Sequence, residues 1–213
     1  MKQSDLFQEK AEGWDADDKH RRLASAVSDA ILRQVSFHER MHVMDFGAGT
    51  GLVSAAIAPL VGKITALDTS EAMLEQLVAK PELRGKVEAV CQDITRNITD
   101  NPLGIKFDRI VSAMTMHHVQ DTHQLIYTFA EHAKPGAVIA LADLDKEDGT
   151  FHPAGTQGVF HHGFDRDGFR AILEEHGFGD VRFVTAHSIP REGKDYPVFL
   201  CVATKQRDQE NSA

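Results

Sequence analysis

The sequence predicts an α/β fold, in which helices cover both faces of a mostly parallel sheet. Apolar runs that are typical of buried strands alternate with segments of helical periodicity. A glycine-rich turn joins the first such run to the next helix, and a short polar connection joins the last two runs. Because 213 residues suffice for one domain with a sizeable core and are few for two, we expect a single domain over residues 1–213.

The first part of the chain is expected to form a helix and then three strands separated by two helices. Apolar residues recur at helical spacing over residues 18–35, and the run "HVMDF" after it suits a buried strand. Pro59 is expected to shorten the second helix, and Pro81 to end the third, which Thr69 or Ser70 caps. The strands expected here are 42–46, 63–68 and 86–92.

The second part of the chain is expected to form four strands and two helices. The segment "KPG" should end the helix over residues 121–133, and Gly177 the helix over residues 166–176. The segment "HSIPREGKD" is predicted to connect a closing hairpin, which adds one antiparallel strand. The strands expected here are 107–114, 137–143, 180–186 and 196–204.

Charge and apolar pattern restrict the partners and the compartment. The formal net charge of −9 argues against broad nucleic-acid binding, which depends on Lys and Arg that neutralise phosphates. The N-terminus lacks the apolar stretch of a signal peptide, and no run approaches the length that spans a membrane. Cys91 and Cys201 lie in apolar runs and are expected to be buried thiols. We therefore expect a cytoplasmic protein without a membrane partner; a nucleic-acid or protein acceptor stays open as an alternative that the acidic balance disfavours.

The turn "DFGAGTG" is the strongest local signal for a ligand. Its glycines, Gly47, Gly49 and Gly51, follow a G-x-G-x-G pattern, whereas a dinucleotide fingerprint would need a third glycine at Leu52. Asp45 would repel a pyrophosphate but attract an ammonium or a sulfonium group. The turn therefore predicts a nucleoside ligand that lacks phosphates and carries positive charge on its tail.

Two further acids follow the next two strands. Asp68 ends the second strand, where a carboxylate can accept hydrogen bonds from both ribose hydroxyls. Asp93 ends the third strand, where it could accept a hydrogen bond from an adenine amine, with Ile94 packed on the ring. Each feature alone could be a tight turn or a helix cap. Together they predict one ligand site at the carboxyl ends of three neighbouring strands.

With these residues the chain resembles class I S-adenosylmethionine-dependent methyltransferases, most of all the ubiquinone- and menaquinone-biosynthesis type. The segments "VMDFGAGTG", "ALDTSEAML", "VCQDI", "FDRIVSAMTMHHV" and "AKPGAVIALAD" occur in the order of that family, and "KPGA" replaces its commoner "KPGG". The resemblance covers residues 40–205, which we expect to be the cofactor-binding core. It implies a seven-stranded sheet in the order 3-2-1-4-5-7-6 with strand seven antiparallel.

The resemblance also implies S-adenosylmethionine as the cofactor and gives roles to individual residues. Trp14 would belong to an N-terminal segment and helix, residues 1–38, that folds over the cofactor; an ordinary anchoring aromatic is the alternative. The residues implied for the methionine part are Asp45, Gly47, Ala48, Gly49, Gly51, Ser112 and Ala113. Those implied for the ribose and adenine are Asp68, Thr69, Ser70, Met73, Asp93 and Ile94.

A general base is needed only if the acceptor is protonated at neutral pH. The candidate catalytic side chains are His118, Asp143 and His162. His118 follows the fourth strand, Asp143 ends the fifth, and His162 lies in the loop after it. A structural role is the alternative for each, and it is favoured for the pair of His117 and His118. No metal site is expected, since the spacings of the candidate ligands match no regular pattern: Asp143, Asp145, His152, His161 and His162.

Residues 146–164 carry four glycines and one proline and show no clean periodicity. Because such a length is unusual for a plain connection, we expect a lid or an acceptor wall, with a surface loop as the alternative.

The predicted function is methyl transfer (class 2.1.1) to a small-molecule acceptor. Two alternatives stay open: a non-catalytic S-adenosylmethionine-binding sensor or partner protein, and a nicotinamide-dependent oxidoreductase, against which Asp45 and Leu52 count. The sequence leaves open the acceptor, the methylated atom and the oligomeric state, a homodimer included.

Overall fold

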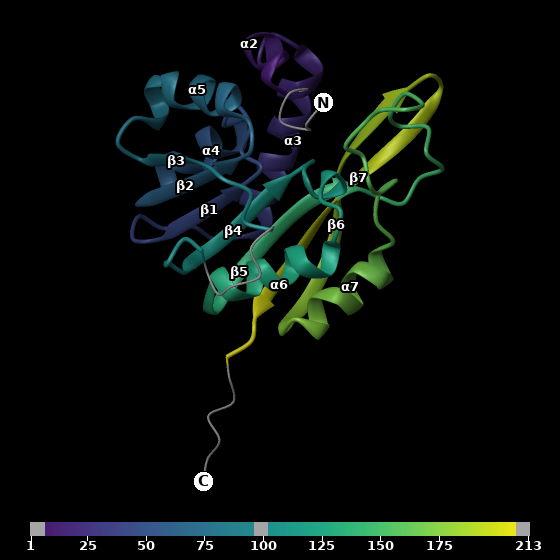
Figure 1. Cartoon of the computed structure of the whole chain (residues 1–213). Coiled ribbons are helices and arrows are strands. Elements are labelled where there is room, and N and C mark those ends of the chain that lie inside the picture. The colour runs from purple at the N-terminus through teal and green to yellow at the C-terminus, as the bar shows by residue number, and fades with distance from the viewer. Residues whose placement is uncertain (1–6, 96–101, 208–213) are drawn as a thin grey trace.

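A seven-stranded sheet in the order β3-β2-β1-β4-β5-β7-β6 lies at the centre of the structure, a computed structural model that describes residues 7–95 and 102–207 (Figure 1). Neighbouring strands from β3 to β5 are parallel, and β7 is antiparallel to both β5 and β6. Strand order and direction confirm the predicted fold. The strands are β1 (His42–Phe46), β2 (Lys63–Asp68), β3 (Val87–Cys91), β4 (Phe107–Ala113), β5 (Ala133–Leu144), β6 (Phe178–Arg191) and β7 (Lys194–Lys205).

The helices lie close to their predicted positions. Asp17, Ser70, Asp121 and Asp165 cap four of them with side-chain oxygens that accept backbone N–H bonds. The described helices are α2 (Ala11–Trp14), α3 (Asp18–Gln34), α4 (Leu52–Ile57), α5 (Glu71–Ala79), α6 (Thr122–His132) and α7 (Arg166–Glu175), with short 3-10 turns η1 (Ala58–Leu60), η2 (Pro81–Leu83) and η3 (Met116–His118). No helix in the described part of the chain has both the length and the apolar character needed to cross a membrane.

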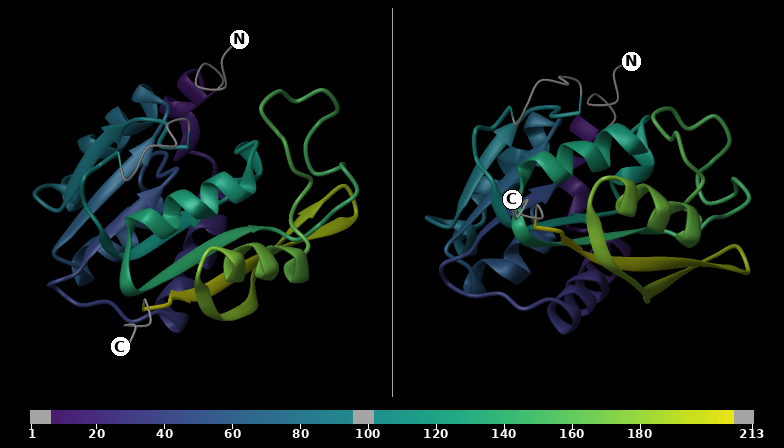
Figure 2. Two further views of the ribbon diagram at one scale, coloured as in Figure 1. Left: turned by 60° about the horizontal axis from the view of Figure 1, so that its bottom comes forward. Right: turned by 90° about the horizontal axis from the view of Figure 1, so that it is seen from below.

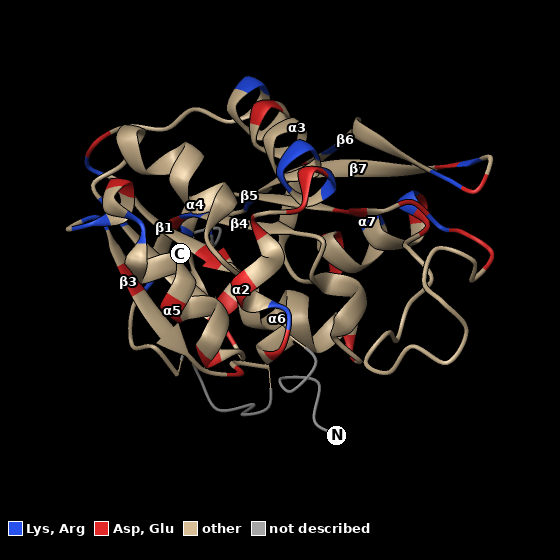
Figure 3. Ribbon diagram, turned by 90° about the horizontal axis from the view of Figure 1, so that it is seen from above, with Lys and Arg blue, Asp and Glu red and all other residues tan. Residues whose placement is uncertain are grey.

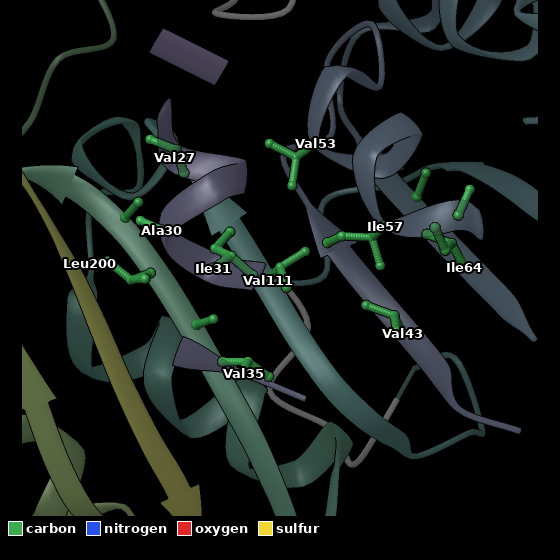
Figure 4. Close-up of a cluster of buried hydrophobic side chains, with 14 of the residues drawn as sticks. Val27, Ala30, Ile31, Val35, Val43, Val53, Ile57, Ile64, Val111 and Leu200 are labelled. Carbon is green, nitrogen blue, oxygen red and sulfur yellow. The ribbon is translucent and has the colours of Figure 1, made fainter. Parts of the chain in front are cut away.

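The sheet separates two hydrophobic cores because side chains alternate along each strand. On one face α3, α4 and α5 pack on residues such as Val43 and Val111, and Figure 4 shows Ile31 of α3 over Val111 of β4. On the other face lie α6 and α7 (Figure 2), and residues of both helices share one hydrophobic cluster with Met44 and Ile110. Burying each such side chain contributes roughly 1.5–3 kcal/mol, so the strand ends between the two cores are held rigidly.

The closing hairpin is longer than expected. The segment predicted as its connection pairs instead, from His187 with Val198 to Arg191 with Lys194, and only Glu192 and Gly193 form the turn. Both turn residues have positive φ, 51° and 80°, which suits a two-residue hairpin. Pro190 misled the prediction, but β6 is an edge strand, where a missing N–H costs no ladder bond. Beyond the sheet, the hairpin extends beside the loop over residues 146–164 (Figure 1).

Two further expectations were wrong. Strand β5 begins at Ala133 rather than at residue 137, because "KPG" forms an irregular strand start beside a register shift between Phe107 and Arg109. Cys91 is exposed because β3 is the other edge of the sheet, whereas Cys201 is buried in the central β7 as expected. Both thiols are free.

Candidate functional site

A cavity of about 580 Å³ opens at the carboxyl ends of β1, β2 and β4. The ends of these strands form its floor, α2 and the start of α3 lie along one side, and residues 115–124 and 151–160 contribute the other. Figure 3 views the molecule from the side of α2 and shows acidic residues on α2 and α5 and basic residues on α3 and the hairpin. This is the edge of the sheet at which the sequence predicts a ligand.

The glycine turn supplies a bare backbone to this cavity. Gly47, Gly49 and Gly51 have φ of 67°, 54° and 81°, values that side chains other than glycine rarely adopt. A Cβ on Gly47 would lie 2.2 Å from the Thr115 side chain, and one on Gly51 would lie 2.7 Å from Leu77. Gly49 has open space beside it, and with Gly47 and Ala48 it lines the cavity. Gly51 instead begins α4 and packs against α5.

Asp68 ties this turn to the next helix. One carboxylate oxygen accepts from the Gly49 N–H at 2.8 Å, and the other accepts from the Ser70 N–H at 2.9 Å. Burial raises the pKa of Asp68, and these backbone bonds oppose the shift. Asp68, Thr69 and Met73 line the cavity, whereas Ser70 is buried and caps α5 by accepting from the Met73 N–H. Each Asp68 oxygen keeps a second lone pair for a ligand.

Asp45 is a buried acid in the wall of the same cavity. It is only 2% exposed, and the Ser54 hydroxyl donates to its carboxylate at 2.6 Å. Burial raises the pKa of Asp45 to about 6; the Ser54 bond opposes this shift and the charge of Asp68 adds to it. A cation placed nearby would favour the ionised form, in agreement with the predicted preference for a positively charged ligand.

The remaining predicted cofactor residues divide into two groups. Asp93 and Ala113 line the cavity, and the Asp93 carboxylate also accepts from the N–H and hydroxyl of Thr95. Ile94 and Ser112 are fully buried and do not line it. Ile94 belongs to the core under α6 and α7, and the Ser112 hydroxyl donates to the Phe46 carbonyl at 2.9 Å, which joins β4 to β1.

The N-terminal segment covers part of the cavity. Trp14 lines it and stacks on His20 with ring centroids 3.9 Å apart. Asp15 holds this segment down, because it accepts from the Thr50 hydroxyl at 2.6 Å and pairs with Lys80 at 2.7 Å. Sequence reasoning missed Asp15 and His20, since their contacts depend on how α2 packs. No periodicity or motif near them signals those contacts.

The structure pairs Asp143 with His117, which is not among the predicted candidate catalytic residues. Its carboxylate binds Nδ1 of His117 at 2.7 Å and accepts from the N–H groups of His117 and Leu144. Both Asp143 and His117 are buried, and His117 lines the cavity whereas Asp143 does not. Because a carboxylate only accepts, Nδ1 carries the proton in neutral His117 and Nε2 carries a lone pair.

His118 and His152 complete a cluster of imidazoles with His117. Their ring centroids lie 4.1 and 5.1 Å from that of His117, and all three rings line the cavity. Nδ1 of His118 donates to the Gly158 carbonyl at 2.7 Å. Burial, followed by the charge of His117, lowers the pKa of His118 and of His152 to about 4, so both rings are neutral at pH 7.

His162 is a second candidate catalytic residue that does not line the cavity, and among the described residues it supports none of the side chains that do. Its side chain is 60% exposed, and it faces Glu147 at 3.4 Å. Glu147 organises the loop instead, since one of its oxygens accepts from the N–H groups of Gly149, Thr150 and Phe151. This turn places Phe151 and His152 on the cavity.

The sequence predicts no metal site, and the group of potential ligands that the structure brings together consists of residues that were not weighed there. Among the described residues, His123, Glu175 and His176 have ligand atoms within 4.8 Å of one another, and none of the three lines the cavity. Two of the candidate ligands considered in the sequence have other partners. Asp145 pairs with Arg166, and Nε2 of His161 lies 2.9 Å from the Val119 carbonyl.

Comparisons with known proteins agree with this geometry. Residues 44–139 match a family described as a methyltransferase domain. The chain is 30% identical over 156 residues to an uncharacterized methyltransferase, C1347.09, of Schizosaccharomyces pombe, over 67% of this chain and 55% of that protein. It is 26% identical over 155 residues to the mitochondrial ubiquinone biosynthesis O-methyltransferase of the same yeast, over 67% of this chain and 54% of that protein. The chain thus spans about half the length of these curated relatives.

A solved structure shares the fold over nearly the whole chain. It is a chain of the complex between the Haloferax volcanii Trm112 methyltransferase activator and a methyltransferase, with a TM-score of 0.73 and 15% identity. The alignment covers 97% of this chain and 99% of that one. At this identity the likeness supports the fold and leaves the substrate to be argued from the site.

Proposed function

Since the chain contains a class I S-adenosylmethionine-dependent methyltransferase domain, we propose that it transfers a methyl group from this cofactor to a small-molecule acceptor. One observation carries the proposal. The bare turn at Gly49, tied to Asp68, and the His117–Asp143 pair line or support the same cavity. The proposed cofactor seat and a group able to accept a proton thus belong to one cavity, as methyl transfer to a protonated acceptor requires.

S-adenosylmethionine is the cofactor of this family, and the described residues fit it. We propose that Gly47, Ala48, Gly49 and Ala113 contact the methionine part and that Asp45 attracts its cationic groups. Asp68 would accept from the ribose hydroxyls with its remaining lone pairs. The proposed adenine and adenosine contacts are Thr69, Met73 and Asp93, with Trp14 over the cofactor. The proposed indirect supports, which do not line the cavity, are Gly51, Ser70, Ile94 and Ser112.

The bound cofactor would supply an electrophilic methyl carbon on a sulfonium with a good leaving group. The acceptor oxygen or nitrogen would form the new bond to that carbon as the carbon–sulfur bond breaks, and the electron pair of that bond would stay on sulfur. Nε2 of His117 takes the acceptor's proton as the bond forms. Asp143, hydrogen-bonded to Nδ1–H, fixes the tautomer that leaves Nε2 able to accept and stabilises the imidazolium that results. We assign His117 the catalytic role and Asp143 a positioning role.

We propose that the surrounding segments limit the access of water to the reacting groups. Phe7 lies at the rim with its ring centroid 6.0 Å from Trp14 and 5.4 Å from His118, so the N-terminal segment reaches from the cofactor side to the acceptor side. The loop over residues 146–164 closes the acceptor side with Phe151 and Phe160. In a cavity without bulk water, alignment of acceptor, methyl carbon and sulfur can account for a large share of the rate.

Calorimetry with S-adenosylhomocysteine tests the cofactor site. Asp68→Asn should weaken binding roughly tenfold to 150-fold, since a lost charge-assisted hydrogen bond costs about 1.5–3 kcal/mol. Asp195→Asn, on the exposed hairpin, is the matched control and should bind as the wild type does. Equal affinity of the Asp68 variant and the control contradicts the assigned ribose site.

Labelled methyl transfer into cell extract tests the acceptor. We expect label in the low-molecular-mass fraction, and less of it with His117→Asn. Because the Haloferax complex contains an activator protein, the purified chain is compared with the chain in extract, which would supply such a partner. Label confined to protein or RNA contradicts a small-molecule acceptor. Cofactor binding with no transfer in either setting favours the non-catalytic sensor instead.

A further inference from the structure

The acceptor side of the cavity has a composition of its own. We call the rings of Phe7, His117, His118, Phe151, His152 and Phe160 the acceptor wall; all six line the cavity. Neighbouring rings in this wall touch edge to face or at a tilt, for example Phe7 on His118 and Phe151 on His152 at 4.8 Å. A wall of flat rings favours a flat ligand, because stacked and edge-to-face contacts with an aromatic ring add to the gain from apolar burial.

The wall offers no fixed cation. Of the described residues that line the cavity none is Lys or Arg, while four are Asp: Asp45, Asp68, Asp93 and Asp121. Arg191 acts electrostatically on His152, but its guanidinium donates to the Phe151 carbonyl and does not line the cavity. The imidazoles of His118 and His152 are neutral at pH 7. A carboxylate or phosphate moved into this wall would therefore lose its hydration without gaining an ion pair, which is costly.

The wall does offer hydrogen-bonding nitrogens. Nε2 of His152 is buried and has no hydrogen-bond partner among the described residues. Nε2 of His117 carries a lone pair, because Nδ1–H is held by Asp143. A buried polar atom without a partner costs about 1–3 kcal/mol, so a ligand that satisfies it binds more tightly by a comparable amount. A polar but uncharged ligand can do so without bringing an unpaired charge.

From this wall we infer that the methyl acceptor is an uncharged aromatic compound bearing a hydroxyl, and that the site rejects acceptors with a carboxylate or phosphate on the ring. The inference rests on the proposed function, since it places the acceptor beside the cofactor. The ring lies among Phe151, His152 and Phe160, and the hydroxyl proton faces His117. A cationic ring is also disfavoured, because three of the four acids that line the cavity lie at the cofactor end, and the fourth, Asp121, is exposed and caps α6.

Three ring compounds of equal size test the charge preference: 4-hydroxybenzamide, 4-hydroxybenzoate and 4-hydroxybenzylamine. Each is titrated by calorimetry into the full chain saturated with S-adenosylhomocysteine. We expect the neutral amide to bind at least about tenfold more tightly than either charged ring. Equal or tighter binding of the carboxylate or the amine overturns the inference, and so does a neutral ring that fails to bind.

A charge placed in the wall should reverse the preference. Gln124 lines the cavity from α6, so Gln124→Lys should raise the affinity for 4-hydroxybenzoate about tenfold relative to the amide. His162→Lys adds the same charge on the exposed part of the loop, outside the cavity, and should leave the ratio unchanged. If the ratio of the two affinities shifts equally in both variants, the net charge of the protein, and not the acceptor wall, sets the preference.

The two proposals fail in different ways. If S-adenosylhomocysteine binds and the three rings do not differ, the inference on the acceptor falls while the proposed cofactor site stands. If S-adenosylhomocysteine itself does not bind, both fall together.

Discussion

The two halves of the cavity are built on different physical bases. On the cofactor side, the ligand would meet main chain and strand ends: the turn at Gly47 and Gly49, and carboxylates at the ends of β1 and β2. On the acceptor side it would meet the rings of η3 and of the loop over residues 146–164. The topology of the sheet fixes the first half, whereas side-chain contacts between segments far apart in sequence fix the second.

The halves also differ in charge. Three of the four acids that line the cavity from described residues lie at the first three strands, and the acceptor side has imidazoles instead. With the proposed sites, cofactor recognition would belong to the fold and acceptor recognition to the loops, a division that fits a fold used for many substrates. Each variant below should affect one half more than the other.

The largest effect is expected at His117. His117→Asn keeps a donor for Asp143 but lacks a basic nitrogen, so the rate of methyl transfer should fall 10²- to 10⁴-fold. Binding of S-adenosylhomocysteine should not change. Initial rates with labelled cofactor and extract acceptor measure the first quantity, and calorimetry the second. His162→Asn is the control; a comparable loss of rate there, or a loss of cofactor affinity in His117→Asn, breaks the division between the halves.

The next largest effect is expected at Gly47, on the cofactor side of the cavity. Gly47→Ala forces a Cβ into the Thr115 side chain at a φ of 67°, so stability should fall by about 2 kcal/mol or more and cofactor binding should weaken severely. For a chain of this size the melting temperature would drop by roughly 4–8 °C.

Gly85→Ala is the control that separates the effect of backbone strain from the effect on cofactor binding. Gly85 has a φ of 73°, open space around it and no place in the cavity. This variant should lose stability from backbone strain alone and keep cofactor affinity. Calorimetry and thermal unfolding of both variants measure the two terms, and unchanged cofactor binding in Gly47→Ala contradicts the assigned turn.

A smaller effect is expected at Asp45, where a substitution should raise stability but weaken cofactor binding. Its folded pKa of about 6 lies above the unfolded value of 3.8, so the ligand-free fold binds more protons than the unfolded chain between these pH values. Stability should therefore fall as pH rises from about 4 to about 6 and remain reduced above that.

At pH 7.5, Asp45→Asn should thus stabilise the ligand-free protein, on the order of 1–3 kcal/mol, while weakening cofactor binding, because the attracting charge is gone. Urea unfolding at pH 4.5 and 7.5 checks the first part and calorimetry the second. A variant that is less stable at both pH values contradicts the assigned cost of this buried charge.

The smallest effect is expected at the hairpin. Asp148 and Lys194 form an exposed pair at 2.5 Å, and the hydrogen bonds from Lys194 and Thr150 lower the pKa of Asp148 to about 2. Lys194→Ala should leave the melting temperature and methyl transfer nearly unchanged, since exposed ion pairs contribute little. Glu147→Gln, which weakens the carboxylate that orders the loop, should reduce transfer more. The reverse order would show that the hairpin, and not Glu147, holds the acceptor wall.

The same division explains what the sequence could predict. Strand order, the capped helices and the placement of Asp45, Asp68 and Asp93 follow from local patterns and from resemblance, and the structure places these acids on one cavity. The partner of Asp143 could not be predicted in this way, because His117 and His118 are adjacent and only the geometry of η3 decides which ring turns toward β5.

Long-range packing accounts for the other differences. The hairpin was predicted too short because Pro190 is tolerated only where the strand has no outer neighbour, and that depends on the whole sheet. His152 was not predicted as a residue of the cavity, because sequence spacing does not show that Glu147 folds the loop back onto the cavity.

The carboxylate of Asp68 has a consequence for how such a protein can diverge. It binds the turn after β1 and the start of α5, and it is also the proposed sugar contact, so one substitution there disturbs architecture and recognition at once. The aromatic rings of the loop over residues 146–164 do not combine these two roles. A lineage can therefore exchange acceptors through single changes in that loop, whereas adopting another nucleoside would require several simultaneous replacements.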